Sequence, residues 1–356
     1  MTASAAPTVP EDLPRSRLKA LVTLAWPVVL SRLGIMIMGV TDAVVVGRYS
    51  AEELAFQGLG WAPTMVVLTT GIGLLYGVQV VTAQFVGEGR REEAGAVLQR
   101  GVLLALGTGL VATAALYFGA GPVMRAMQLE GDLGPESAAV VRVLALSMPL
   151  YLMGVACAFW LEALERPVPA MLVMAAVNIV NLILNLWLVP GNSPFPVDGA
   201  VASAWTTLFS RGAYAVGLIL IIVKWREAHG LGVFMWRTAR RWHSYWGRLM
   251  KVGAATAVSY FVETAGFAGM NIIAGWIGGL AVAAFAIIFN ILGLVFMLPL
   301  GIAGATAVLV GKAHGERDRT GVRTAGLLGL GVAFALLVVI SLVVVLGRDL
   351  MSMAYT

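Results

Sequence analysis

The sequence is poor in charged residues. Only 12% of its 356 residues are Asp, Glu, Lys or Arg, whereas a soluble domain carries about 25%. Apolar residues make up 59% of the chain, and its mean hydropathy is +0.88. This composition excludes both an ordinary water-soluble domain and a disordered chain. The sequence therefore predicts an all-α polytopic membrane protein.

Cysteine and histidine are scarce as well. Cys157 is the only cysteine, which excludes an intramolecular disulfide bond and a cluster of cysteine ligands. The three histidines lie far apart, without the spacing of metal ligands. The only Gly-Lys pair, Gly311-Lys312, lacks the leading glycine and the following Ser or Thr of a nucleotide-binding loop. The sequence thus predicts neither an enzyme nor a pump driven by ATP.

Long apolar segments account for most of the chain. A membrane-spanning helix needs about 20 mostly apolar residues. Nine stretches meet this requirement, at 20–47, 54–86, 95–119, 138–163, 169–190, 199–223, 249–275, 281–311 and 324–347. Residues 1–19 are polar and rich in proline, which predicts a loose N-terminal tail.

The segment 224–248 between the sixth and seventh stretches has a different pattern. Its large apolar residues fall close to one helical face, and its arginines populate the rest. This pattern predicts an amphipathic cytoplasmic linker that lies on the membrane surface. Two roles stay open for it, a hinge between two helical bundles and a plain basic anchor.

Positive charge is unevenly divided among the loops. If the N-terminus is cytoplasmic, most Lys and Arg residues fall in cytoplasmic loops, and the other side keeps only Arg48, Arg125 and Arg348. Because cytoplasmic loops are enriched in Lys and Arg, we expect a cytoplasmic N-terminus in a cell inner membrane. The pI near 9.6 then reflects topology and contact with anionic lipids, not nucleic-acid binding.

Two similar turns indicate an internal repeat. Gly87-Glu-Gly-Arg-Arg-Glu-Glu-Ala-Gly95 follows the second apolar stretch, and Gly311-Lys-Ala-His-Gly-Glu-Arg-Asp-Arg-Thr-Gly321 follows the eighth. Aligning residue 87 with residue 311 gives an offset of 224. Six spans separate the two copies, so both have the same orientation, which predicts parallel lobes with a site between or within them.

The repeat divides the chain into two transmembrane parts. Residues 20–223 are predicted to form a first lobe of six helices, and residues 249–356 a partial second lobe of three helices. Two equal lobes would need about three further spans. The chain is therefore expected to be C-terminally incomplete, or to be completed by a further copy of itself.

Two acidic residues lie inside predicted spans, where a charge costs about 2.5–3.5 kcal/mol on insertion scales. Asp42 lies in the outer half of the first span, and Glu263 lies in the middle of the seventh. The offset of 224 places them about one helical turn apart in the two copies. Each is a candidate to exchange a proton or to hold a cation. The alternative is a structural ion pair, of Asp42 with Arg48 and of Glu263 with Arg32 or Arg211.

Amides line one face of the fifth span. Asn178, Asn181 and Asn185 are spaced by three and four residues, so they share a helical face. Since amides that face lipid are costly, this face is predicted to point into the bundle. It either coordinates an ion through its carbonyl oxygens or joins helices by hydrogen bonds. Thr206 and Thr207 of the sixth span have the same two alternatives.

Taken together, these motifs resemble the multidrug and toxic compound extrusion (MATE) transporters. The motifs that carry the resemblance are Trp26-Pro27, Asp42, Asn178-Ile-Val-Asn181-Leu-Ile-Leu-Asn185, Thr207-Leu-Phe-Ser210-Arg211, Phe261-Val-Glu263, Phe289-Asn290 through Pro299, and Gly311-Lys-Ala-His-Gly315-Glu. Position 185 is Asn, where part of the family has Asp.

The resemblance implies a secondary antiporter that exports drug-like organic cations in exchange for Na⁺ or H⁺. It implies two six-helix lobes that rock against each other, small-molecule substrates and no resident cofactor. Asp42, Asn181, Asn185 and Thr207 would form the first-lobe site for cation and substrate, and Glu263 would serve the second lobe.

Two other functions stay open. One is a flippase for lipid-linked saccharides, from the same superfamily, which would need a cavity rich in Arg and Lys. Only Arg32 and Arg211 are candidates for such a cavity. The other is a membrane fragment or partner subunit without transport activity.

Overall fold

The described part of the chain consists of helices joined by turns and loops, and it contains no strand. The computed structural model describes residues 13–127, 132–192, 194, 196–233, 242–277 and 279–346. Its α-helices are α1 (Leu13–Tyr49), α2 (Ala51–Gly87), α3 (Ala94–Ala126), α4 (Leu133–Leu146), α5 (Met148–Ala163), α6 (Val168–Leu188), α7 (Gly199–Lys224), α8 (Trp242–Ile277), α9 (Gly279–Gly315) and α10 (Arg319–Leu346). Two short 3₁₀ helices are η1 (Arg91–Glu93) and η2 (Arg226–His229). The predicted all-α membrane fold is confirmed.

Fewer helices than predicted are long and apolar enough to cross a membrane. Within the described residues there are 7, or 8 if the pair α4 and α5 counts as one span. These two helices meet at a bend of 43°. Pro149 lies in the first turn of α5, and because proline lacks an N–H and blocks the preceding turn, it explains the break. The count of nine spans therefore stays a prediction.

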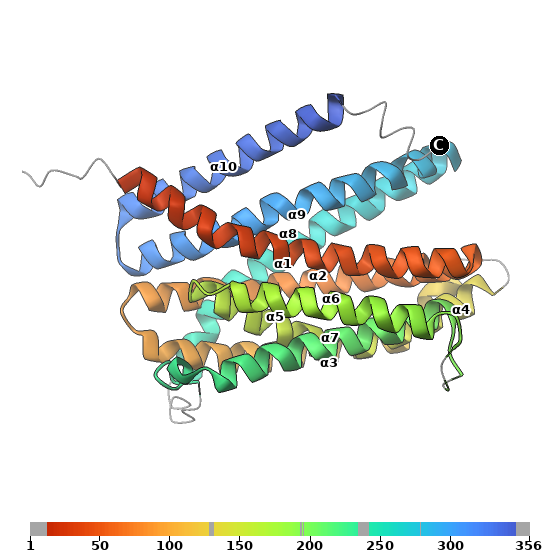
Figure 1. Ribbon diagram of the computed structural model, residues 1–356, viewed down its shortest axis with the longest axis horizontal. Helices are drawn as coiled ribbons and strands as arrows, with labels where there is room; N and C mark the ends of the chain where they lie inside the picture. The colour runs from red at the N-terminus through yellow and green to blue at the C-terminus, as the bar shows by residue number, and fades with distance from the viewer. Residues whose placement is uncertain are drawn as a thin grey trace, which may run out of the picture.

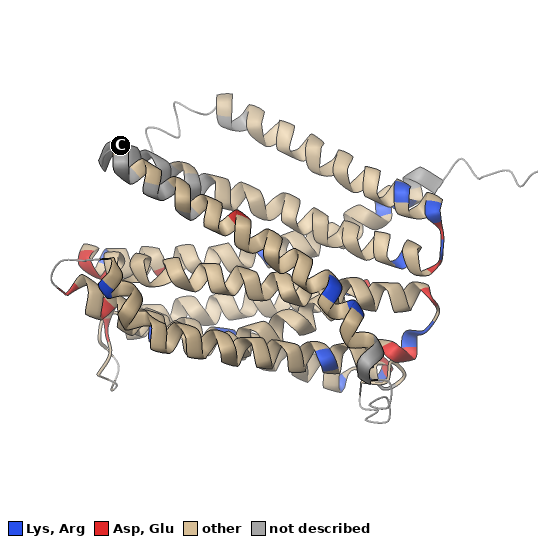
Figure 2. Ribbon diagram, turned by 180° about the vertical axis from the view of Figure 1, so that it is seen from behind, with Lys and Arg blue, Asp and Glu red and all other residues tan. Residues whose placement is uncertain are grey.

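The helices α1–α7 form one bundle, and α8, α9 and α10 lie along one side of it (Figure 1). α8 packs on α2, α9 packs on α1 and α2, and α10 packs mainly on α9. Lys and Arg gather where α2, α5, α7 and α9 end, as Figure 2 shows. We call this the basic end. The residues Arg90, Arg166, Lys224, Arg248 and Lys312 mark it, because they lie at or next to these helix ends or contact them.

Close backbone contacts join the two halves of the repeat. A side chain on Gly73 of α2 would overlap the backbone of Ala257 in α8. In the same way, a side chain on Gly301 of α9 would overlap Val29 of α1. The two contacts are related by one offset of 228, from residue 73 to 301 and from 29 to 257.

The turns at the basic end show a second pair of glycine contacts that are related by one offset. A side chain on Gly87 would overlap the Lys312 carbonyl oxygen, and a side chain on Gly315 would overlap the Gln84 carbonyl oxygen. The offset is again 228, from 87 to 315 and from 84 to 312. The offset of 224 expected from the sequence is therefore about one turn short. A four-residue shift keeps nearly the same helical face, so the sequence pattern matches almost equally well in both registers.

Replacing Gly87 with alanine is expected to destabilise the protein by about 1–3 kcal/mol, because the added methyl group overpacks the contact with Lys312. Thermal unfolding in detergent measures this change. Gly107→Ala in α3 is the matched control, because a methyl group there meets nothing within 4 Å. It should be neutral or stabilising by up to about 1 kcal/mol. Equal melting temperatures for the two variants would contradict the close contact.

The ends of two predicted segments differ from the structure. α1 begins at Leu13, so the last part of the predicted tail 1–19 is helical. α8 begins at Trp242, so the last residues of the predicted linker 224–248 continue into a long helix, because their apolar face runs on into the span. The predicted amphipathic residues Phe234, Met235, Arg237, Arg240 and Arg241 lie outside the described residues.

The described beginning of the linker is tied to α3. The Gly95 N–H donates to the Leu231 carbonyl at 2.7 Å. The Gln99 amide donates to the Val233 carbonyl, also at 2.7 Å. These bonds hold the chain that leaves α7 against the basic end of the α1–α7 bundle.

Candidate functional site

Asp42 lies at the centre of a buried polar cluster. Its side chain on α1 is 0% exposed. The Asn185 amide of α6 donates to Oδ1 at 2.7 Å, and the Thr207 hydroxyl of α7 donates to Oδ2 at 2.7 Å. Three helices therefore meet at one carboxylate, and both of its oxygens accept a hydrogen bond. Asp42 thus has hydrogen-bond partners on α6 and α7, which differs from the alternative of an ion pair with Arg48.

Asn181 completes the cluster on the α6 face. It is buried and is a further polar neighbour of Asp42, although its amide makes no hydrogen bond of normal geometry. Three atoms lack a partner, namely Asn181 Oδ1, Asn181 Nδ2 and Asn185 Oδ1. A buried polar atom without a partner costs about 1–3 kcal/mol. The cluster therefore offers free ligand capacity beside a carboxylate.

Most of the atoms in this cluster that could bind a cation are oxygens. Asp42, Asn181, Asn185 and Thr207 present carboxylate, amide and hydroxyl oxygens, which are the ligands that hard cations prefer. Within the described residues, no group of three or more His, Cys, Asp and Glu side chains is placed to hold a metal ion. The chemistry of the cluster fits a proton or a hard monovalent cation better than a transition metal.

Asn178 does not join the cluster, although it shares the α6 face. Its amide donates back to the Met174 carbonyl at 2.9 Å, within its own helix. Its side chain lies near the position where Gly34 of α1 lets the two helices approach. The predicted amide triad thus divides into two residues at Asp42 and one that packs against α1.

Arg211 is a buried neighbour of the cluster. It follows Thr207 by one turn on α7, and its guanidinium donates to the Ser147 hydroxyl at 2.7 Å. It also lies over the rings of Trp61 and Tyr151, at 5.2 and 4.8 Å. These contacts are with a hydroxyl group and two aromatic rings, not with the Glu263 carboxylate that the sequence left open as a partner.

A second buried cluster joins α1, α2 and α5. Arg32 donates to both carboxylate oxygens of Glu162, at 3.3 and 3.1 Å, and Gln79 donates to Glu162 Oε2 at 2.8 Å. The guanidinium also lies 4.8 Å from the centre of the Phe159 ring. Arg32 therefore has a carboxylate partner, as the sequence suggested, but this partner is Glu162.

Glu162 is the functional candidate that the sequence argument missed. It lies at the end of the predicted span 138–163, where a charged residue is ordinary and draws no attention. One feature of the sequence could have revealed it, namely two acidic residues, Glu162 and Glu165, in one short segment. Only the fold tells them apart, because it buries the first completely and leaves the second in a turn.

Glu263 lies away from the Asp42 cluster, on α8. Its side chain is half-buried, and the neighbouring Thr264 hydroxyl lies 3.1 Å from the Thr69 hydroxyl of α2. The predicted alternative, a pair with Arg32 or Arg211, is wrong, because those two cations have the partners described above. At the offset of 228, Asp42 aligns with residue 270, two turns from Glu263, so the two acids are not equivalent in the repeat.

Sequence comparison with known proteins finds one family of proteins. The sequence model of the MatE family matches residues 27–187 and 255–356. The chain is 43% identical over 339 residues to a probable multidrug resistance protein NorM of Caulobacter vibrioides, covering 94% of this chain and 71% of that protein. It is 26% identical to the multidrug resistance protein NorM of Photobacterium profundum, covering 96% of this chain and 75% of that protein.

Solved structures show the same fold. A transporter of the MOP superfamily from Pyrococcus furiosus superposes with a TM-score of 0.87 at 21% identity, over 98% of this chain and 77% of that one. A multidrug resistance MATE transporter in an outward-facing conformation superposes with a TM-score of 0.86 at 22% identity, over 96% and 74% of the two chains.

Proposed function

Because this chain belongs to the MATE family of multidrug efflux transporters, we propose that it is a secondary antiporter that exports drug-like organic cations in exchange for Na⁺ or H⁺. Members of this family are multi-pass membrane transporters and not enzymes. The relatives are named multidrug resistance proteins, which supports drug-like compounds as the cargo.

The buried Asp42 carboxylate carries this proposal. A charge held away from water is costly unless it is compensated, so this group binds a proton or a cation in each cycle. Asn181, Asn185 and Thr207 supply the remaining oxygens for a hard cation. A positively charged substrate competes for the same negative charge. Exchange follows because the coupling ion and the substrate cannot both satisfy Asp42 at once.

Glu263 is proposed to serve the second lobe, 249–356, in the same way. It lies beside Thr264, which contacts Thr69 of α2, and so it lies near the contact between α8 and the first lobe, 20–223. An acid at this place would change partners when α8 moves relative to α2. Such a change links ion binding in one lobe to the movement of the other.

The arrangement of the helices supports alternating access. The backbone contacts between α2 and α8, and between α1 and α9, lie towards the basic end. Away from this end, α8 and α9 diverge from α1 and α2 (Figure 1). We propose that the basic end faces the cytoplasm, in keeping with the distribution of Lys and Arg, and that the two lobes are in contact at this end in the arrangement described here.

The proposed exchange is tested by expressing the chain in cells that lack their main efflux systems and by following ethidium accumulation. Accumulation should fall when an inward Na⁺ or H⁺ gradient is imposed, and it should return when that gradient is collapsed. Only one of the two gradients is expected to be effective, which identifies the coupling ion. Accumulation equal to that of empty cells under both gradients would contradict export of organic cations.

The flippase alternative receives no support from the site. A pyrophosphate-linked lipid would need cations that are available in a cavity. Arg32 is held by Glu162, and Arg211 is held by Ser147 and two aromatic rings. Both candidate cations are thus engaged within the first lobe.

A further inference from the structure

The charged contacts between the two lobes lie at the basic end. Arg248 of α8 donates to Glu88 at 3.2 Å, and Lys312 of α9 donates to Glu165 at 2.5 Å. Both acids belong to the first lobe, 20–223. Lys312 belongs to the second lobe, and Arg248 is the last linker residue, on the helix α8 that continues into the second lobe. In addition, the Tyr245 hydroxyl of α8 donates to the Glu93 carboxylate.

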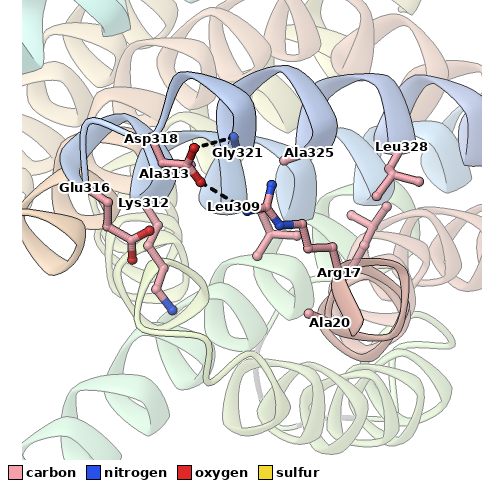
Figure 3. A pocket seen from close by; sticks show the side chains of 11 residues that line it. Arg17, Ala20, Leu309, Lys312, Ala313, Glu316, Asp318, Gly321, Ala325 and Leu328 are labelled. Atoms are coloured by element: carbon pink, nitrogen blue, oxygen red, sulfur yellow. Dashed lines mark hydrogen bonds and ion pairs between the residues drawn. The ribbon is translucent and has the colours of Figure 1, made fainter. Parts of the chain in front are cut away.

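A third ion pair lies at the edge of the same end. Figure 3 shows Arg17 of α1 reaching across a pocket towards Asp318, between α9 and α10, and the two side chains are 3.0 Å apart. The Gly321 N–H, which donates to Asp318 at 2.8 Å, and the Arg17 guanidinium hold the pKa of Asp318 below its ordinary value. This carboxylate is therefore charged at neutral pH.

Polar contacts at the opposite end have a different character. There, Glu53 accepts from the Ala200 N–H at 2.7 Å, and the Tyr49 hydroxyl donates to Asp198 at 3.1 Å. Both contacts stay within α1–α7. In the part of the chain that the structure describes, ion pairs between the lobes are thus confined to one end.

Glu165 occupies an unusual backbone position for this contact. Its φ is 60°, in the left-handed region that favours glycine. It follows α5 in a turn closed by hydrogen bonds to the last carbonyls of that helix, a position where glycine is the usual residue. The corresponding turn after α2 has Gly89, with φ of 74°. A glutamate at this position costs free energy in the turn, and what it adds is a carboxylate that reaches Lys312.

We propose that the ion pairs Glu165–Lys312 and Glu88–Arg248 form a latch that holds the two lobes together at the basic end and breaks each time this end opens. We call these four residues the basic-end latch. The proposal gives a role to the repeated mixed-charge turns, because Glu88 follows α2 and Lys312 lies in the last turn of α9. It rests on the proposed alternating access, but it specifies which contacts control it.

The latch has the properties of a reversible contact. The side chains of Lys312 and Glu165 are 33% and 42% exposed, and those of Arg248 and Glu88 are 50% and 26% exposed. Ion pairs with this exposure are weak and are screened by salt. They bias the equilibrium between the closed and open basic end without locking it. Beneath them, the glycine contacts at Gly87 and Gly315 bring the two backbones close enough for the pairs to form.

Spin labels at the basic end measure the separation of the lobes directly. Cysteines are introduced by Glu92→Cys in the first lobe and Arg319→Cys in the second, because both side chains are exposed. The native Cys157 is buried and does not interfere. The distribution of distances between the labels, by pulsed electron paramagnetic resonance, gives the ratio of open to closed molecules.

Reversing one charge, in Glu165→Lys or Lys312→Glu, should raise this ratio about tenfold, because an attraction is replaced by a repulsion. The double variant, which carries both reversals, should restore the wild-type ratio. Arg166→Glu is the matched control, because its pair with Glu227, at 2.9 Å, is also exposed at the basic end but does not join the lobes. It should leave the distances unchanged.

Neutral variants test the latch even if a charge reversal impairs folding. Glu165→Gln and Lys312→Gln should each raise the open fraction about threefold, and 1 M salt should do the same for the wild-type chain. Unchanged distances in all single variants, or a double variant that stays as open as the singles, would overturn the latch. The readout is a distance, so a chain that failed to export ethidium would still give a valid answer.

Discussion

Asp42→Asn is expected to reduce gradient-dependent ethidium export to the level of cells without the transporter. The substitution keeps the size and shape of the side chain, and one oxygen stays available to the Thr207 hydroxyl, which donates to Asp42 at 2.7 Å. It removes the negative charge, which is the only property that lets the group bind a proton, a cation and a cationic substrate in turn. The measurement is ethidium accumulation under the effective gradient.

Controls separate a lost site from a lost fold. Glu92→Gln makes the same carboxyl-to-amide change at an exposed position and should leave export unchanged. Asp42→Asn should melt at the wild-type temperature or above, because a buried charge has been removed. Export of more than half the wild-type rate by Asp42→Asn would exclude Asp42 as the coupling residue.

The neighbours of Asp42 should have graded effects. Thr207→Val removes one hydrogen bond to a charged acceptor, and such a bond contributes about 1.5–3 kcal/mol. We expect export to fall by about tenfold or more. Asn178→Ala is the comparison within the amide row, because Asn178 bonds only within α6, and its export should stay close to that of the wild type.

Much of the site at Asp42 could be predicted from the sequence. A carboxylate inside an apolar span is costly, and amides spaced by three and four residues share a face, so the sequence brought Asp42, Asn181 and Asn185 forward as candidates. The structure places these side chains together, with Thr207. Helical spacing alone could not separate Asn178 from the other amides, because it gives the face of a helix but not the height at which a neighbouring helix crosses it.

Pairing between distant helices was harder to predict. Arg32 was expected to have a carboxylate partner, but Glu162 lies 130 residues further along the chain, and no local pattern links the two. The repeat was visible, yet its register was misjudged by one turn, because small residues recur on the same helical face. The backbone contacts of Gly87 and Gly315 fix that register, since they depend on packing in three dimensions.

Glu162→Gln is expected to lower stability by about 3–5 kcal/mol, because it leaves the Arg32 guanidinium without a counter-charge in a buried site. The Arg32 and Glu162 side chains are only 8% and 1% exposed, so water cannot replace the lost partner. Gln79, which donates to Glu162, cannot neutralise the cation. In thermal unfolding in detergent, we expect the melting temperature to fall by about 10 °C.

The double variant Arg32→Met with Glu162→Gln gives the decisive comparison. It removes both charges, so it should recover most of the stability that either single variant loses. Arg166→Met serves as the control for an exposed pair, because Arg166 and Glu227 are 51% and 66% exposed, and its cost should be below about 1 kcal/mol. If the losses of the two single variants simply add in the double variant, Arg32 and Glu162 act independently. If the double variant is nearly as stable as the wild type, the two charges compensate each other, and stability is lost only when one of them is removed alone.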